Sequence, residues 1–430
     1  MDIVRFGTLY SIPTSNGVSR PSAVRGQGFH MINMGELFSY DIIDEIPMER
    51  VCLSEKEQSK YLVEKGDLLF ARQSLVAAGA GKCSIVNNII EPTTFESHLI
   101  RVRLDKTKCI PLYYYYLFKL PDNPIKAIVN QCAQAGIRGS ELQRIKVPLP
   151  SLSAQRRIAS TLFAFDNLID NNNRRIRLLE QMAENLYKEW FVRFRFPGHE
   201  KAEFAHSKLG KLPSSFRVAN MGDVFADYIG GGWGNDDMSE DYPVEASVIR
   251  GADFPKVWHY DVSSCPRRYH KASNYKSRQL KDGDIVMEIS GGTSEQPVGR
   301  TVLVTQDMIN RFKDGKVICA SFCKMIRLKK EIVSPYFFYY WMHYLYDTRI
   351  IDRFQLQSTG IINFKFESFL RKGDVMIPPK KIQEAFDKQV VPVFKEMNQL
   401  AIQIENLSHQ RDLLLPRLMS GKLEVKAVSQ

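Results

Sequence analysis

Two long heptad repeats, one in the middle of the chain and one near its end, constrain the fold more than any other feature. Their apolar positions alternate in steps of four and three, and the second run repeats the first at an offset of 228 residues. The first run comprises Ile158, Leu162, Phe165, Ile169, Asn172, Ile176, Leu179, Ala183, Leu186 and Trp190, and the second comprises Phe386, Val390, Val393, Met397, Leu400, Ile404, Leu407, Arg411, Leu414 and Leu418. A strict a/d repeat over about four heptads is typical of a coiled-coil seam. The sequence therefore predicts two long helices that pair, with Asn172 and Arg411 as the strongly polar position of each seam.

The repeat extends upstream of both helices. A Pro-rich entry precedes a glutamine before each heptad run, and an aromatic run, a basic apolar segment and a Gly-Asp dipeptide recur in the same order. The parallel segments are Gly66-Asp67 with Gly283-Asp284, Ser97–Leu104 with Ser321–Leu328, Tyr113–Tyr116 with Phe337–Tyr340, and Gln155 with Gln383. Two copies of about 200 residues, each of ordinary domain size, therefore form one pseudo-symmetric chain.

Composition limits the class of protein and of partner. The 430 residues are 44% hydrophobic and 25% charged, as in a soluble globular protein. A net charge of +11 favours an anionic partner, although it is weak support alone. Seven cysteines without a CxxC pair indicate free thiols in a reducing cytoplasm, and Cys319 and Cys323 lack further zinc ligands at the usual spacing. Without a signal peptide or a long apolar run, the expected location is cytoplasmic.

Each half has a mixed local pattern. Short segments rich in branched or aromatic residues predict strands over Tyr61–Phe70, Ser97–Leu104, Asp284–Ile289, Arg300–Thr305 and Cys319–Ile326. The aromatic runs Leu112–Leu117 and Tyr336–Tyr346 follow prolines and predict a helix that closes each half. For the four consecutive tyrosines we expect alternation between the core and the wet edge of a helix, in preference to base stacking. Each half is therefore expected to be a small α+β domain.

These residues carry a specific resemblance. The stretch Val147–Ile158 (VPLPSLSAQRRI), continuing to Leu186–Phe191 (LYKEWF), resembles the central helical region of type I restriction-modification specificity subunits (HsdS). Gln410–Leu423 (QRDLLLPRLMSGKL) resembles the distal helical region of the same family, and the Gly-Asp-apolar strand of each half is typical of its target recognition domains. The resemblance covers the whole chain. Pro392 departs from the pattern, because a proline should kink or divide the second helix.

The resemblance implies the architecture. The expected fold is α+β, with two pseudo-symmetric α/β target recognition domains separated by two long antiparallel coiled-coil helices. Its domains would be a first recognition domain at 1–150, a central helical region at 151–195, a second recognition domain at 196–378 and a distal helical region at 379–425. In an antiparallel seam of this register, Asn172 should face the neighbourhood of Ile404 and Arg411 that of Phe165.

The resemblance also implies the function and the partners. A chain of this family would bind double-stranded DNA and read a bipartite, asymmetric target, since its two heads differ in sequence. Two methyltransferase subunits would join it to form a modification complex, and translocase/nuclease subunits would complete the restriction complex. No cofactor or metal is expected on this chain, because S-adenosylmethionine, ATP and magnesium would bind to the partner subunits.

Candidate DNA contacts are donors and acceptors in polar loops at equivalent places of both halves, since such groups read base edges and phosphates. In the first half they are Asn16, Arg20, Arg25, Gln27, Arg72, Gln73, Ser74, Lys82, Gln134 and Arg138. In the second half they are Trp233, Asn235, Arg250, Ser290, Thr293, Arg300, Gln357, Ser358, Thr359 and Asn363. Each could equally be a solvated loop residue, so the argument depends on their matching positions.

No catalytic motif stands out. The chain lacks an Asn/Asp-Pro-Pro-Tyr/Phe methylation motif, and Ala78–Cys83 (AGAGKC) lacks the first glycine and the final Ser/Thr of a phosphate-binding loop. Asp284 and Glu288 resemble the start of a nuclease carboxylate pair, but Ser290 stands where a catalytic lysine is needed. We therefore expect a non-catalytic DNA-recognition subunit. A stand-alone DNA-binding nuclease and a structural coiled-coil adaptor remain the alternatives.

Overall fold

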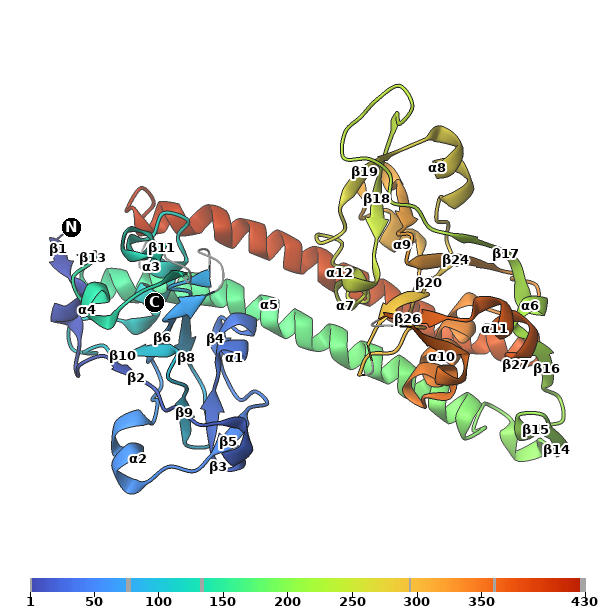
Figure 1. The fold of residues 1–430 in the computed structure, drawn as a ribbon, viewed down its shortest axis with the longest axis horizontal. Helices are drawn as coiled ribbons and strands as arrows, with labels where there is room; N and C mark the ends of the chain where they lie inside the picture. Colours follow the sequence, from blue (N-terminus) through green and yellow to red (C-terminus); the bar gives the residue numbers. More distant parts are fainter. Residues whose placement is uncertain (1, 75–78, 132–134, 294, 359–360, 426–430) are drawn as a thin grey trace. The chain divides into compact units, whose positions relative to one another are not determined.

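The computed structural model describes residues 2–74, 79–131, 135–293, 295–358 and 361–425 (Figure 1). The chain divides into two compact units, one made of Met1–Leu168 with Leu407–Gln430 and the other of Ile169–Asn406. These units divide each long helix, whereas the four domains expected from the sequence treat the helical regions as separate. Those domain boundaries stay a prediction.

The two predicted long helices are confirmed. Helix α5 spans Leu152–Tyr187 and continues into a wider π-helical turn at Lys188–Val192, and α12 spans Lys380–Met419. Every described seam position from Ile158 to Trp190 is buried or partly buried, as are those from Phe386 to Leu418. The sequence pattern therefore identified the buried stripe of both helices correctly.

Polar contacts between the two long helices occur in both units, and those of the second unit give the direction of pairing. In the first unit Arg411 donates to Asp166 over 2.6 Å. In the second unit Asn172 donates to Gln403 over 3.1 Å. In both contacts the observed partner lies one residue from the predicted one. Within the second unit Arg175 also donates to Glu396 over 2.8 Å, so residue numbers rise along α5 as they fall along α12, and the helices pair antiparallel in the expected register.

Pro392 does not divide the second helix, so the expected division is wrong, while the expected kink stays a prediction. Helix α12 is continuous from Lys380 to Met419, and Pro392 is exposed. A proline removes one hydrogen bond to the carbonyl four residues earlier, here that of Lys388. On an exposed face water can bind that carbonyl, while the buried Val390 and Val393 hold the helix against its partner.

A buried glutamine at the start of each long helix forms hydrogen bonds with the head of the same half. The Gln155 amide accepts a hydrogen bond from the Ile110 backbone N–H over 2.8 Å and donates to the carbonyl of the proline before α5 over 2.8 Å. The Gln383 amide accepts from the Ser334 N–H over 2.7 Å and donates to the carbonyl of the proline before α12 over 2.7 Å. Both side chains are buried. Each glutamine satisfies backbone groups from two segments at once and fixes where the helix begins.

The first head belongs to the first unit. Its main sheet has the order β2-β10-β6-β8-β4. The strands are β2 (Ser15–Asn16), β10 (Leu99–Val102), β6 (Leu68–Ala71), β8 (Cys83–Val86) and β4 (Ile42–Ile43). A second sheet contains β5 (Glu49–Val51), β3 (Arg25–Ile32) and β9 (Thr93–Phe95), and β1 (Asp2–Arg5) pairs with β13 (Lys146–Leu149). The helices are α1 (Met34–Ser39), α2 (Glu55–Tyr61), α3 (Pro111–Lys119) and α4 (Gly139–Leu142).

The second head belongs to the second unit and repeats this plan. Its main sheet has the order β17-β24-β20-β22, from strands Phe225–Gly230, Cys323–Leu328, Ile285–Glu288 and Thr301–Leu303. A second sheet contains β19 (Arg267–His270), β18 (Val244–Ile249) and β23 (Val317–Cys319). The pairs β14 (Phe204–Ser207) with β15 (Gly210–Pro213) and β16 (Arg217–Asn220) with β27 (Asp374–Ile377) complete the strands outside the site described below. The helices are α6 (Met221–Val224), α7 (Phe254–Val257), α8 (Ala272–Arg278), α9 (Gln306–Ile309), α10 (Pro335–Asp347) and α11 (Phe366–Lys372).

Most predicted strands are present, but two predictions need correction. The predicted strand Cys319–Ile326 is interrupted, because Cys319 ends β23 and β24 begins at Cys323. The predicted strand Tyr61–Phe70 is wrong at its start, because Tyr61 ends α2 and only β6 is extended. The two predicted closing helices are confirmed as α3 and α10. The expected α+β fold with two antiparallel long helices is therefore confirmed. None of the helices in the described ranges is long and apolar enough to cross a membrane.

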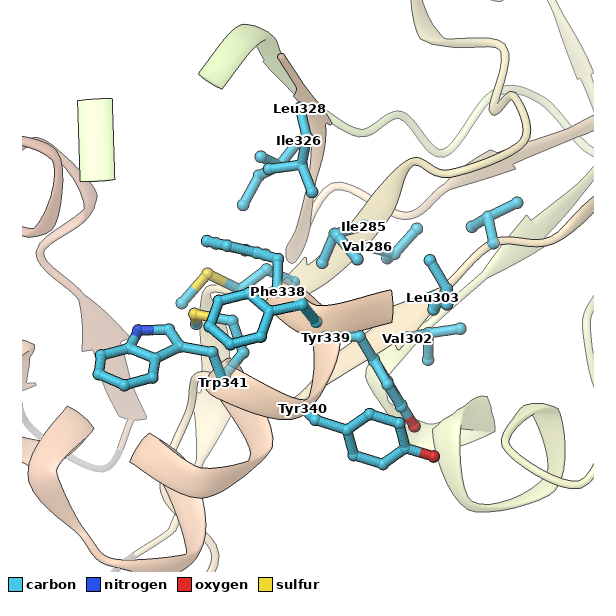
Figure 2. Close-up of a cluster of buried hydrophobic side chains, with 14 of the residues drawn as sticks. Ile285, Val286, Val302, Leu303, Ile326, Leu328, Phe338, Tyr339, Tyr340 and Trp341 are labelled. Carbon is cyan, nitrogen blue, oxygen red and sulfur yellow. The ribbon is translucent and has the colours of Figure 1, made fainter. Parts of the chain in front are cut away.

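The closing helices form the aromatic core of each head. Figure 2 shows Phe338 and Tyr339 of α10 beside branched side chains of β20 and β22. In the first head Tyr113, Tyr114, Tyr115 and Tyr116 are all buried, with exposed fractions of at most 2%. The expected alternation with a wet edge is therefore wrong. It failed because α3 is covered on both sides: the Tyr114 hydroxyl donates to the Pro148 carbonyl and the Tyr116 hydroxyl to Asp166 of α5.

Candidate nucleic-acid interface

A small polar sheet stands at the same place in both heads. In the first head it contains β11 (Asn130–Gln131), β12 (Ala135–Gly136) and β7 (Gln73–Ser74). In the second head it contains β21 (Ser290–Gly292), β26 (Ile361–Phe364) and β25 (Gln355–Ser358). β7 and β21 each follow the central main-sheet strand that the Gly-Asp dipeptide precedes. The sheets therefore bring together candidate DNA contacts that are far apart in the sequence.

Strand pairing sets the geometry of the first small sheet. Gly136 pairs with Gln73, and the Ile137 N–H donates to the Arg72 carbonyl over 2.9 Å. A Cβ atom on Gly136 would lie 3.0 Å from that carbonyl oxygen, so glycine permits this close approach. The Arg72 guanidinium is half-buried and has no hydrogen bond or ion pair to the described part of the chain. Arg72, Gln73 and the exposed Arg138 thus lie around one sheet.

The second small sheet places different side chains on the same frame. Ser290 pairs with Asn363, and the Ser290 hydroxyl donates to the Asn363 amide oxygen over 2.6 Å. Thr293 is exposed at the end of β21. Gln357 and Ser358 lie on β25, paired with Ile362 and Ile361. Ser290, Thr293 and Asn363 thus place hydroxyl and amide groups on the frame where the first head has a guanidinium and an amide.

The remaining candidates of the first head do not join this sheet. Asn16 and Gln27 are exposed on β2 and β3. Three of the cations are already bound within the head: Arg20 to Glu57 (2.7 Å), Arg25 to Glu49 (2.5 Å), and Lys82 to Asp41 (3.3 Å) and the Phe38 carbonyl (2.7 Å). Gln134 lies outside the described residues, as does Thr359 of the second head. As DNA contacts all of these stay predictions.

Two arginines of the second head are held by carboxylates. Arg300 is 8% exposed and donates two hydrogen bonds of 2.8 Å to Glu288. Arg250 donates two of 2.9 Å to Asp253. To touch DNA, either guanidinium would have to leave a carboxylate that it already neutralises. This arrangement weakens the case for Arg300 most, because it is the more buried of the two.

The predicted candidate Trp233 contacts an arginine, Arg268, that the sequence did not predict. Trp233 is 41% exposed, and the Arg268 guanidinium lies over its ring at 4.7 Å from the centroid. The neighbouring candidate Asn235 is exposed, and its backbone forms an isolated antiparallel β-bridge with Tyr269. Arg268 was missed because no local pattern links it to Trp233, which lies 35 residues earlier. Arg268 is also ion-paired with Asp236, so the exposed indole face is the part of this pair on which a base could stack.

The Gly-Asp dipeptides are structural. Asp67 and Asp284 are each 1% exposed. Asp67 accepts two hydrogen bonds of 2.7 Å from Arg103, and Asp284 accepts bonds of 2.8 and 2.7 Å from Arg327. These bonds raise the pKa of both arginines above its ordinary value. Because Glu288 is likewise bound to an arginine, the carboxylate pair considered for a nuclease is neutralised within the protein.

Several known proteins are similar to this chain over most of its length. The family described as "Type I restriction modification DNA specificity domain" matches residues 27–181. The type I restriction enzyme MjaIX specificity subunit of Methanocaldococcus jannaschii is 25% identical, with 86% of this chain and 81% of the relative covered. The HindI specificity subunit of Haemophilus influenzae is 21% identical, with 85% of this chain and 88% of the relative covered.

A solved structure shares the fold. The S subunit of a type I restriction-modification system from M. genitalium has a TM-score of 0.54 at 13% identity, covering 99% of this chain and 96% of that chain. The matched family, the relatives aligned over most of the chain and the repeated head-and-helix fold agree. By these matches the chain is similar to type I restriction-modification specificity subunits over most of its length.

Proposed function

We propose that this protein recognises a bipartite, asymmetric DNA target as the specificity subunit of a type I restriction-modification complex. The observation that carries the proposal is the small polar sheet, which repeats in both heads while its side chains differ. A shared frame gives both heads the same way of approaching a duplex. Different side chains on that frame would read different half-sites.

The chain itself would be non-catalytic. Asp284 and Glu288 are bound to Arg327 and Arg300, which leaves neither carboxylate to hold a catalytic metal as the head is folded. The chemistry would come from two methyltransferase subunits and from translocase/nuclease subunits, which would bind S-adenosylmethionine, ATP and magnesium. Relatives named as specificity subunits of restriction enzymes support this division of labour.

An exchange of heads tests the proposal. The complex would be assembled with a chain whose residues 1–147 come from a relative, and methylated adenines would be mapped by sequencing. We expect one half of the recognised site to change while the other half stays the same. A change in both halves would contradict independent reading. Site-specific methylation or metal-dependent cleavage by the purified chain alone would contradict the non-catalytic role.

A single substitution tests the small sheet. Arg72→Ala should weaken DNA binding by about 1–3 kcal/mol if the guanidinium contacts a base, and should relax one position of the first half-site. A phosphate contact would instead weaken all sequences and reduce the salt dependence by about one charge. Arg174→Ala, an exposed arginine on α5, is the matched control and should leave affinity unchanged. Unchanged binding by Arg72→Ala would remove this sheet from the interface.

A further inference from the structure

The second sheet of the first head gathers three ligand-type side chains from separate segments. His30 lies on β3, Glu45 follows β4, and Glu91 precedes β9. One ligand atom from each, a ring nitrogen and two carboxylate oxygens, lie within 4.8 Å of one another. No comparable group of three occurs elsewhere in the described ranges of the chain.

His30 provides a second and independent observation. The residue is 8% exposed, and its Nδ1 atom is buried without a hydrogen-bond partner. Buried polar atoms are nearly always satisfied, so a buried Nδ1 atom without a partner, on a ring near two carboxylates, needs an explanation. The ring is also too far from either carboxylate for an ion pair, because none is formed within 4.0 Å. A bound cation would satisfy the imidazole and both acids together.

We propose that His30, Glu45 and Glu91 form a binding site for one divalent transition-metal ion of the zinc type. Imidazole nitrogen and carboxylate oxygen bind such ions at about 2.0–2.2 Å. Ligands on opposite sides of an ion are then at most about 4.4 Å apart, so closure onto the ion needs only small side-chain movements. Both glutamates are exposed, and their side chains can make those movements.

Neighbouring groups orient the carboxylates. Glu45 accepts a hydrogen bond from the Ile90 N–H over 3.1 Å, and Glu91 binds Arg50 of β5 over 2.8 Å. Each bond uses one oxygen, which leaves the other for a metal. Arg50 faces His30 across the β3–β5 pairing. The ion would tie β3 to the segment after β4 and to the segment before β9, and so hold the strand that begins at Arg25 and carries Gln27.

Zinc titration tests the site with a readout independent of DNA. The full chain would carry Cys52→Ser, which removes an exposed thiol able to bind zinc. After dialysis against a chelator, Zn²⁺ alone would be added and measured by calorimetry and by elemental analysis. We expect about one ion per chain, and a rise in the melting temperature that grows with zinc concentration.

Variants separate the site from adventitious binding. Glu45→Gln should weaken zinc binding at least about tenfold and abolish the thermal shift, while the metal-free melting temperature stays the same because Glu45 is exposed. His30→Gln should also lose binding. His98→Gln is the control, since His98 lies 3.6 Å from Glu96 in the same head but outside the group. Equal zinc affinity in Glu45→Gln and its parent, or loss in His98→Gln alone, would overturn the proposal.

Discussion

The two halves of the molecule share their supporting contacts and differ in the side chains that they present. Gln155 and Gln383 make the same bonds at the start of each long helix, and Asp67 and Asp284 bind the equivalent arginines. The small sheets keep their strand pairing while their residues change. The contacts that position a head are thus repeated, and the groups available for recognition are not. This separation allows one half to acquire a new surface without disturbing the fold.

The largest expected effect tests the helix seam, where the symmetry is only approximate. Ile176 is 1% exposed, whereas its counterpart Ile404 is partly buried. Ile176→Asp should cost about 4 kcal/mol, because it buries a charge without a partner, and Ile404→Asp should cost less. Chemical denaturation measures both. Leu178→Asp, at an exposed position on the same helix, should have little effect. Equal losses for Ile176→Asp and Leu178→Asp would contradict the seam.

The buried ion pairs give the next largest effect. Asp67→Asn and Asp284→Asn should each destabilise the protein by about 3 kcal/mol, since an arginine loses its bidentate carboxylate in a buried place. Thermal unfolding followed by hydrogen exchange would assign each loss to its own unit. Asp282→Asn, at the exposed neighbour of Gly283, is the control. A large loss in only one of the two units would show that the repeated motif has different roles in the halves.

The glutamine contacts should matter less. Gln155→Ala and Gln383→Ala each leave a backbone N–H and a proline carbonyl without a partner, which costs about 2 kcal/mol. Gln383→Ala should cost slightly more, because its amide also donates to the Ile332 carbonyl over 3.2 Å. Denaturant midpoints of the two variants, compared with Gln389→Ala on the exposed face of α12, measure the difference. A larger loss for Gln155→Ala would reverse this order.

The smallest effect concerns a difference between the halves beside these glutamines. Asp387 accepts a hydrogen bond of 2.6 Å from the Ser334 hydroxyl, whereas Ala159 stands at the equivalent place of the first half. Burial raises the pKa of Asp387. Its contribution to stability is therefore fully present below the unfolded-state pKa and is lost as pH rises through the folded-state pKa.

Asp387→Asn should remove that pH dependence. The variant should match the parent at acidic pH and exceed it at neutral pH by less than about 1 kcal/mol. Melting temperatures from pH 4 to pH 7 would show the two curves separating as pH rises. Asp170→Asn, an exposed carboxylate of α5, provides the control and should follow the parent throughout. Curves that separate towards low pH instead would contradict a raised pKa.

The parts of the fold that depend on local periodicity and on internal repetition could be predicted from the residues alone. The heptad pattern predicted both long helices and their buried stripes, because side-chain spacing along a helix follows directly from its geometry, while the antiparallel orientation came from the family resemblance. Comparison of the two halves also located the paired glutamines, the Gly-Asp strands and the aromatic helices. It further placed Gln73 and Ser290 at equivalent positions, which proved to lie on matching small sheets.

Tertiary structure alone decided which side chains are free. Arg72 and Arg300 are equally plausible candidates in the sequence, but only Arg300 meets a buried carboxylate. Tyr113–Tyr116 look half-exposed by periodicity, yet α5 covers their outer side. Arg268 lies over Trp233, and His30 lies near two glutamates, across long intervals of chain. Such pairings depend on how strands are ordered in a sheet, and a local sequence pattern does not encode that order.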